Sequence, residues 1–250
     1  MDTDSIASRI DRAIAQALIV AVGTIIGGWF VGHGFASGRA ADRYVSLKGI
    51  AEREVNADLA IWPLRIVVAD NDLARAQARL AAQVREVTRF LARNQVDTSQ
   101  VVLQDYAVTD AFANQYRSGE QAANRYVINQ TMVVRSTRPE LVRAASQHVG
   151  DLVSAGVVLS SGGDYGGGGP TYLFTGLNRL KPEMIAEATA RAREAAERFA
   201  TDSRSHLGGI RRASQGLFEI LPRDQAPGIS EESQMVKTVR VVSTVDYFLR

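Results

Sequence analysis

The chain has 250 residues, a formal net charge of +2 and no cysteine, and 46% of its residues are hydrophobic. The lack of cysteine excludes a disulfide scaffold, a cysteine nucleophile, a zinc ribbon, an iron–sulfur site and a lipid-modified N-terminal cysteine, because each needs sulfur. The small positive charge is too little for the surface of a typical nucleic-acid-binding protein, so we expect no nucleic-acid partner.

The first predicted element is a transmembrane helix. Residues 13–38 carry no charged side chain, and roughly 20 helical residues cross a bilayer core of about 30 Å. A cleaved secretory signal usually has a shorter apolar core, of about 7 to 15 residues. We therefore expect a short tail over residues 1–12, an uncleaved signal anchor over 13–36 and a linker over 37–43.

Signal cleavage is the alternative for the same segment. Gly34, Phe35 and Ala36 form a small-x-small pattern of the kind that signal peptidases cut. Cleavage after Ala36 would release a soluble protein in place of an anchored one.

Four glycines in this segment are candidates for helix packing: Gly23, Gly27, Gly28 and Gly32. They form two pairs in which the glycines stand four residues apart, and small residues at that spacing let transmembrane helices approach closely. Arginines stand on both sides of the segment, so the positive-inside rule does not decide its orientation.

Strand-like and helix-like periods alternate beyond residue 43. Expected strands cover residues 59–69, 101–109, 125–136, 157–160, 171–175, 211–220 and 236–249. Expected helices cover residues 73–91, 139–156 and 182–199. This order favours one α+β domain over residues 44–250, with three helices on one face of a largely antiparallel sheet. Its first half resembles a ferredoxin-like unit, that is, a split βαβ.

Local signals refine the three helices. In the first, Leu73, Ala76, Leu80, Val84, Val87 and Leu91 form the apolar stripe, and Asp70 and Asn71 offer a cap. The second opens with the capping-box spacing of Thr137–Glu140 and with a proline near its first position. The third opens at Pro182, and its stripe consists of Met184, Ile185, Ala188, Ala192, Ala195 and Phe199. Glu187 with Arg191, and Glu194 with Arg198, have the spacing of helical ion pairs.

No catalytic or metal-binding pattern is present. The glycine-rich segment 162–169 lacks the Gly-Lys-Ser/Thr and G-x-G-x-x-G registers of phosphate-binding loops. His33, His148 and His206 do not have the spacing of metal ligands. No G-x-S-x-G, H-E-x-x-H or complete S-x-x-K signature occurs. We predict a protein that is not an enzyme and that holds neither a cofactor nor a metal.

Two polar loops are candidate subunit-contact or pore-lining segments. One covers residues 111–124 and contains Tyr116 and Arg117. The other is the glycine-rich segment, which contains Asp164, Tyr165 and Gly166. Both lack a sustained period, which is typical of long loops, and such loops often carry function.

Several strings make the region from Tyr44 to Arg250 similar to the SIMPL family, a group of bacterial envelope proteins. They are Lys48-Gly49, Ala51-Glu52, Val55, Ala57-Asp58, Trp62, Phe174–Asn178, Lys181–Thr189, Ala213–Phe218 and Val239–Phe248. The resemblance implies an α+β fold and a periplasmic or outer-envelope location. For some members it implies ring-like homo-oligomers that act as channels or scaffolds, and for others a link to oxidative-stress tolerance. It implies no agreed enzyme activity and no catalytic residues.

These observations lead to one main hypothesis and two alternatives. The main one is a non-enzymatic protein of the inner membrane, with a single span, its C-terminal domain in the periplasm, and a homo-oligomeric ring, channel-like or scaffold assembly. The partners are then other copies of the chain and the membrane, and no small-molecule ligand is specified. The second is a soluble periplasmic stress-protection or ligand-binding protein. The third is an unrecognised envelope hydrolase, supported only by scattered carboxylates and serines.

Overall fold

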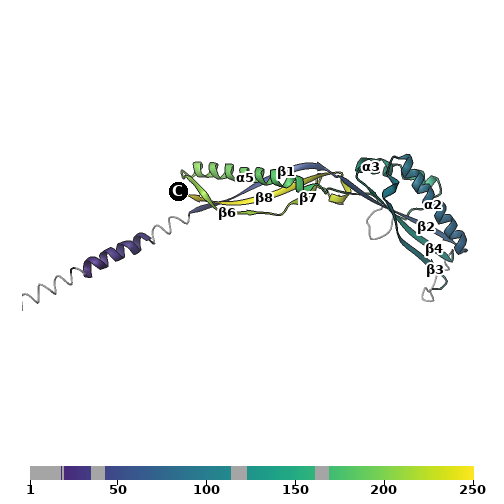
Figure 1. Ribbon diagram of the computed structural model, residues 1–250, viewed down its shortest axis with the longest axis horizontal. Helices are drawn as coiled ribbons and strands as arrows, with labels where there is room; N and C mark the ends of the chain where they lie inside the picture. Colours follow the sequence, from purple (N-terminus) through teal and green to yellow (C-terminus); the bar gives the residue numbers. More distant parts are fainter. Residues whose placement is uncertain (1–17, 19, 35–42, 114–122, 161–168) are drawn as a thin grey trace, which may run out of the picture. The chain divides into compact units, whose positions relative to one another are not determined.

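The protein is α+β with antiparallel sheets. A computed structural model describes residues 18, 20–34, 43–113, 123–160 and 169–250 (Figure 1). Its contacts divide the chain into two compact units. Unit 1 comprises Met1–Ile50, Ile185–Gly216 and Val242–Arg250, and unit 2 comprises Ala51–Met184 and Leu217–Val241. Three long elements contribute residues to both units: β1 (Tyr44–Asn56), α5 (Leu177–Asp202) and β8 (Val236–Leu249).

Unit 2 contains a four-stranded sheet with the order β3-β4-β2-β5. Its strands are β2 (Leu59–Asp70), β3 (Val101–Asp110), β4 (Tyr126–Ser136) and β5 (Thr171–Leu173), and every neighbouring pair is antiparallel. Helix α2 (Leu73–Arg93) joins β2 to β3, while β4 lies between these two strands. This arrangement is the split βαβ that the sequence predicts.

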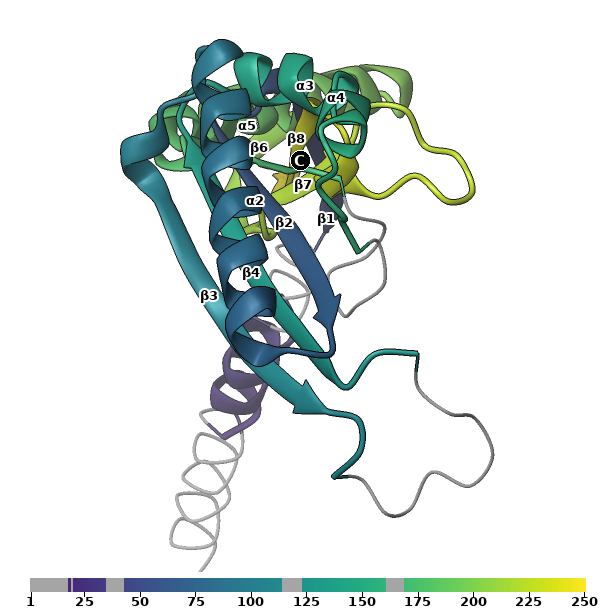
Figure 2. The same ribbon diagram turned by 90° about the vertical axis from the view of Figure 1, so that its right-hand side faces the viewer.

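Helices cover one face of this sheet. Figure 2 shows α2 lying along β2 and β4, and α3 (Pro139–Gln147) also contacts β2. A short helix, α4 (Gly150–Ser154), follows, and unit 2 also contains two 3-10 turns, η1 (Thr98–Gln100) and η2 (Glu231–Ser233), and the start of α5. The second expected helix is therefore broken, because His148 ends α3 in a non-helical conformation.

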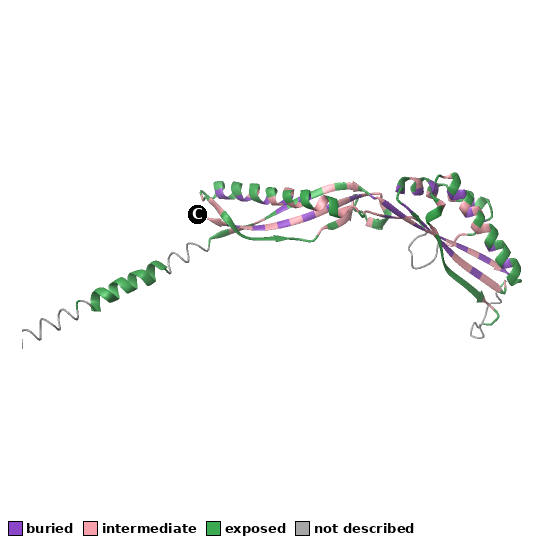
Figure 3. Ribbon diagram, in the orientation of Figure 1, coloured by how far each residue is buried: buried purple, intermediate pink, exposed green. Residues whose placement is uncertain are grey.

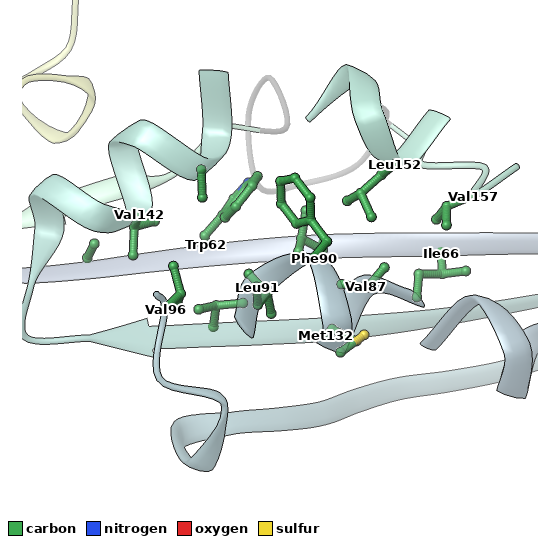
Figure 4. Packing of buried hydrophobic residues seen from close by; sticks show 14 of the residues in the cluster. Trp62, Ile66, Val87, Phe90, Leu91, Val96, Met132, Val142, Leu152 and Val157 are labelled. Atoms are coloured by element: carbon green, nitrogen blue, oxygen red, sulfur yellow. The ribbon is translucent and has the colours of Figure 1, made fainter. Parts of the chain in front are cut away.

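The core of unit 2 lies between the sheet and these helices. Alternate residues of β2 face it, and the side chains of Trp62 and Ile66 are at most 1% exposed. They meet Val87, Phe90 and Leu91 of α2 (Figure 4). Each fully buried side chain of this size contributes about 1.5–3 kcal/mol to folding. This cluster packs one face of β2 against α2 and leaves the opposite face of the strand open.

Unit 1 is built on a second sheet with the order β1-β8-β6, where β6 is Leu207–Gln215. Helix α5 runs along this sheet (Figure 1). The helix residues Ala192 and Ala196 pack against Val245 and Tyr247 of β8. Strand β7 (Glu219–Pro222), which belongs to unit 2, pairs with residues 237–240 of β8.

The backbones of β1 and α5 approach each other closely at Gly49. A Cβ atom built on Gly49 would lie 1.8 Å from the carbonyl oxygen of Ala188 and 2.5 Å from the backbone nitrogen of Ala192. Only a residue without a side chain fits there. The same close approach explains the alanines of α5, because the two backbones come close together only where both elements carry small residues.

Described residues 18 and 20–34 of the N-terminal segment are helical. Their large apolar side chains are exposed, for example Ile25 at 70% and Val31 at 74% (Figure 3). Within the described residues, no helix is both long enough and apolar enough to span a bilayer. The transmembrane anchor over residues 13–36 therefore stays a prediction.

The structure corrects several sequence predictions about strands. The strand β1 was not expected, and the two sheets replace a single one. The strand expected over residues 211–220 is two strands, β6 and β7. The strand expected over 157–160 makes only an isolated bridge, between Leu159 and Ile66. Most of these errors have one cause, namely that strand pairing joins residues far apart in the chain.

Helix boundaries also differ from the predictions. Asp72, and neither Asp70 nor Asn71, caps α2 by accepting a hydrogen bond from the backbone N–H of Arg75 at 2.9 Å. The N-cap residue of α3 makes no side-chain hydrogen bond, so the expected capping box is wrong, although the proline is at the helix start. Helix α5 begins at Leu177 and contains Pro182.

The buried faces of α2 and α5 were predicted in part. Ala76, Leu80, Val87 and Leu91 of α2 are buried as expected, together with Phe90. In α5 the buried residues recur every four positions: Met184, Ala188, Ala192, Ala196 and Ala200. The expected Phe199 is 46% exposed. Both predicted ion pairs of α5 are present, with N–O distances of 2.8 Å for Arg191 to Glu187 and 2.5 Å for Arg198 to Glu194.

Candidate assembly and binding surfaces

Strand β3 is an edge strand whose residues are exposed along most of its length (Figure 3). Its large apolar side chains are exposed to a degree unusual for a sheet: Val102 at 52%, Leu103 at 50%, Tyr106 at 51% and Val108 at 43%. An edge strand also presents a row of backbone N–H and C=O groups on its unpaired side. Exposed apolar side chains on such an edge are the features of a surface that pairs with another strand.

The register of β3 explains the exposure of two of these apolar residues, Leu103 and Val108. Leu103 lies opposite Met132 of β4, and Val108 lies opposite Ile128. Directly opposed residues point to the same face, and both β4 partners are at most 1% exposed in the core. The side chains of Leu103 and Val108 therefore continue the core layer beyond the part of the sheet that α2 covers.

A β-bulge divides this edge into two segments. The register with β4 shifts between Gln104 and Ala107, and Asp105, inside the shift, has a φ angle of 53°. Aspartate is one of the few non-glycine residues that adopt this left-handed conformation. Bulges and charges on edge strands limit how much of the strand a partner can pair with. The unpaired edge therefore consists of two regular segments, Val101–Gln104 and the residues from Ala107 onward.

A cavity of about 890 Å³ lies against the sheet face opposite α2. Ile61 and Pro63 of β2 and Thr131 and Val133 of β4 form its floor, and Gly169–Thr171 and residues of η2 also line it. Its charged lining residues are Asp105 and Glu232. Volumes of about 300–1,000 Å³ are typical of small-molecule sites.

A buried ion pair holds η2, one of the elements that line this cavity. The side chain of Lys237 is fully buried, and its ammonium group pairs with the carboxylate of Glu231. The same nitrogen donates a hydrogen bond to the backbone carbonyl of Glu231 at 2.6 Å. A buried ammonium group is stable only when it is paired in this way, so Lys237 fixes the segment that carries Glu232.

A second charged cluster ties the end of β2 to α2. Asp70 accepts hydrogen bonds from Arg75, with N–O distances of 2.7–3.0 Å, and Arg79 lies 3.0 Å away. The guanidinium group of Arg75 holds the pKa of the Asp70 carboxyl well below its ordinary value, and a hydrogen bond from the backbone N–H of Asp72 acts in the same direction. A carboxylate so strongly ionised is a structural anchor and is unsuited to acid–base catalysis near neutral pH.

Asp110 and Arg125 hold the two ends of the loop between β3 and β4. Their side chains form an ion pair with an N–O distance of 3.1 Å, and the side chain of Asn71 accepts a hydrogen bond from the backbone N–H of Arg125. The hydrogen bonds from Arg125 lower the pKa of Asp110. This loop contains Tyr116 and Arg117, two candidate contact residues, but both lie outside the described residues.

The other predicted site residues are placed as follows. Gly23, Gly27, Gly28 and Gly32 lie on the N-terminal helix, and a Cβ atom added to any of them would meet nothing within 4 Å. Their packing against other helices stays a prediction. Asp164, Tyr165 and Gly166 fall outside the described residues. Among the described residues, no group of three His, Asp or Glu side chains could hold a metal ion.

The comparisons with known proteins identify one family. The model of the SIMPL family, described as a protein of unknown function (DUF541), matches residues 45–246. Among curated proteins, none matches the chain significantly. Nearly the whole folded domain, including β3 and both sheets, lies within the matched range.

Proposed function

Because the chain belongs to the SIMPL family, whose function is unknown, we propose a function from its exposed surfaces: it is a non-enzymatic, membrane-anchored envelope protein whose α+β domain self-associates through β3. The observation that carries the proposal is the exposed apolar edge of β3. A second copy of the chain is the partner because it brings the same strand, with the same unpaired backbone groups and apolar side chains.

The N-terminal segment supports the anchor. It combines a stretch without charge, at residues 13–38, with a described helix whose apolar side chains touch no core. Such side chains are stable when lipid or other helices cover them. Glycines on open helix faces suit close packing of several such helices, one from each copy. The resemblance to envelope proteins favours a domain in the periplasm and an anchor in the inner membrane.

Edge pairing sets the kind of assembly. Two β3 strands that pair about a two-fold axis form a closed dimer, while a ring needs a further contact that joins different surfaces. We propose that β3 supplies one contact and the bundle of anchors another, so that the assembly is a cyclic or dihedral scaffold. A channel along its axis is the more specific form of this proposal.

The test uses a double variant of the full-length protein, Val102→Lys with Val108→Lys. Lysine on an edge strand opposes pairing through charge repulsion and desolvation. Both side chains are at least 43% exposed, so the domain keeps its fold. The matched control is Val153→Lys with Leu217→Lys, at positions that are 62% and 88% exposed and lie away from β3.

The measurement is the mass of the detergent-extracted protein by light scattering, with the detergent contribution subtracted. We expect oligomers for the wild type and the control and a smaller species for the β3 variant. A monomeric wild type, or a β3 variant with the same mass as the control, would overturn self-association through β3.

One observation favours a second candidate, a soluble periplasmic ligand-binding protein. The cavity of about 890 Å³ on the open sheet face is large enough for a small molecule. Mass spectrometry of the mature N-terminus separates the two candidates. A protein that begins after Ala36 supports the soluble form, and a protein that keeps residues 13–36 supports the anchored form.

A further inference from the structure

A cavity of about 580 Å³ in unit 1 combines three arginines with exposed aromatic surface. Arg43, Arg204 and Arg250 line it, together with Tyr44 and Phe199. The aromatic side chains are 48% and 46% exposed. The cavity therefore offers positive charge and apolar surface together.

Backbone hydrogen bonds bring the three arginines together. The backbone N–H of Leu249 donates to the carbonyl of Arg43 at 2.9 Å, which joins the end of β8 to the start of β1. His206 and Arg250 exchange two backbone hydrogen bonds, at 2.7 and 2.9 Å. Arg204 lies in the turn after α5, with a φ angle of 54°. The backbone thus places Arg43 and Arg250 at the end of the sheet and Arg204 in the turn that precedes His206.

In the described part of the chain, the charge of these arginine side chains is not balanced by neighbouring acidic side chains. No acidic side chain lines it, and within the described residues none of the three guanidinium groups has an ion-pair partner. Arginines on the body of α5 differ, because Arg191 and Arg198 each pair with a glutamate one turn away. The guanidinium group of Arg211 lies 4.1 Å from the ring centre of Tyr44, one of the aromatic side chains that line the cavity.

We propose that this cavity binds the phosphate group of an anionic phospholipid. The inference rests on the proposed membrane anchor. The chain from Gly34, the last described helical residue, to Arg43 spans at most roughly 30 Å when fully extended. Anchoring of the helix therefore keeps Arg43 near the membrane surface, where the lipid headgroups lie.

The chemistry of the lining matches such a headgroup. The planar guanidinium group donates two parallel hydrogen bonds to phosphate oxygens, which gives both energy and geometry. Aromatic side chains are favoured at the interface between headgroups and acyl chains. A free phosphate ion would gain from the arginines but nothing from Phe199 or Leu249, so the apolar part of the lining favours the lipid.

The test compares two charge-matched double variants of the full-length protein. The cavity variant is Arg43→Gln with Arg204→Gln. The control is Arg85→Gln with Arg193→Gln, which removes two exposed arginines outside the cavity. Each protein is reconstituted in vesicles of phosphatidylcholine with about 30 mol % phosphatidylglycerol, or in vesicles of phosphatidylcholine alone.

Two readouts separate the two proposals. Flotation of the vesicles tests the anchor, and native mass spectrometry of the extracted protein counts the phosphatidylglycerol molecules that it retains. We expect all proteins to float. The wild type and the control retain phosphatidylglycerol in preference to phosphatidylcholine, and the cavity variant binds it roughly 20- to 30-fold more weakly, at about 1 kcal/mol for each arginine.

Each other outcome has a definite meaning. If all proteins float and the cavity variant retains as much phosphatidylglycerol as the control, the headgroup site is wrong and the anchor stands. If the wild type does not float, the anchor is wrong and the headgroup inference fails with it. If inorganic phosphate in the millimolar range displaces the lipid and the wild type does not prefer phosphatidylglycerol, the cavity binds free phosphate, which overturns the lipid proposal.

Discussion

Replacing Gly49 with alanine tests the packing of α5 on β1. The added Cβ atom would lie 1.8 Å from the carbonyl oxygen of Ala188, 2.5 Å from the backbone nitrogen of Ala192 and 2.9 Å from the carbonyl carbon of Ala188. All three atoms belong to the helix backbone, so no side-chain rotation can relieve the overlap. The helix or the strand must move.

The geometry sets the size of the effect. Carbon and oxygen atoms that are not bonded need a separation of about 3.3 Å, so the backbone must shift by roughly 1.5 Å at this crossing. A shift of that size loosens the contacts of Ala192 and Ala196 with β8. Overpacking of a rigid core costs about 1–3 kcal/mol. We expect a loss at the upper end of that range, about 3 kcal/mol, because the clash is with backbone.

Thermal unfolding of the full-length protein, followed by circular dichroism in detergent, measures the loss. A change of 3 kcal/mol corresponds to a decrease in Tm of about 6–12 °C for a protein of this size. Gly209→Ala is the control, because a Cβ atom at Gly209 meets nothing within 4 Å. Equal Tm values for the two variants would refute the argument that Gly49 is required by the approach of α5.

Two further predictions concern charged groups. Asp70→Asn should lower the Tm at pH 7. The pKa of Asp70 is lower in the folded protein than its unfolded value of about 3.9. The stability that the Asp70 carboxylate contributes is therefore fully present above about pH 3.9 and is lost as the pH falls towards the folded pKa. A Tm difference between Asp70→Asn and the wild type that persists unchanged at pH 2 would contradict this pH dependence. Glu231→Ala should destabilise the protein by about 3 kcal/mol because it leaves the buried ammonium group of Lys237 unpaired. Lys237→Met should lower the free energy of unfolding, measured with urea, by less than Glu231→Ala does, since it leaves only a partly exposed carboxylate without its partner. A larger loss for Lys237→Met than for Glu231→Ala would show that the ion pair is not what holds η2.

Local periodicity predicted the helices better than the strands. The stripe of α2 follows from its sequence because its spacing of three and four residues needs no knowledge of other elements. Strand β1 was missed because two of its inward-facing residues are Gly49 and Ala51, which lack the branched side chains that mark a strand. The glycine is explained by α5, which begins more than a hundred residues later.

The start of α5 shows a second limit. Proline favours the first turn of a helix, so the sequence predicts a start at Pro182. The helix begins at Leu177 instead and continues through Pro182, which cannot donate the backbone hydrogen bond to Asn178 that another residue would make there. The helix tolerates the loss of this single hydrogen bond. Local sequence rules do not show at which prolines a helix continues.

The candidate surfaces could not be predicted from local sequence patterns. The apolar residues of β3 predict a strand, but its position at the sheet edge depends on the pairing of β4 with β2. The arginines of the second cavity are also distant in the chain, at positions 43, 204 and 250, and no local pattern joins them. What the sequence did show was the uncharged N-terminal segment and the family resemblance, which the family match confirms.

The most direct test of the proposed function is cysteine cross-linking in membranes. The chain contains no cysteine, so single cysteines at Val102, Val108 and, as a control, Leu217 report only the contacts of those positions. We expect to find the full-length protein in the membrane fraction, and we expect a short bifunctional thiol reagent to join copies at Val102 and Val108 but not at Leu217. A protein found in the soluble fraction, or equal cross-linking at all three positions, would contradict it.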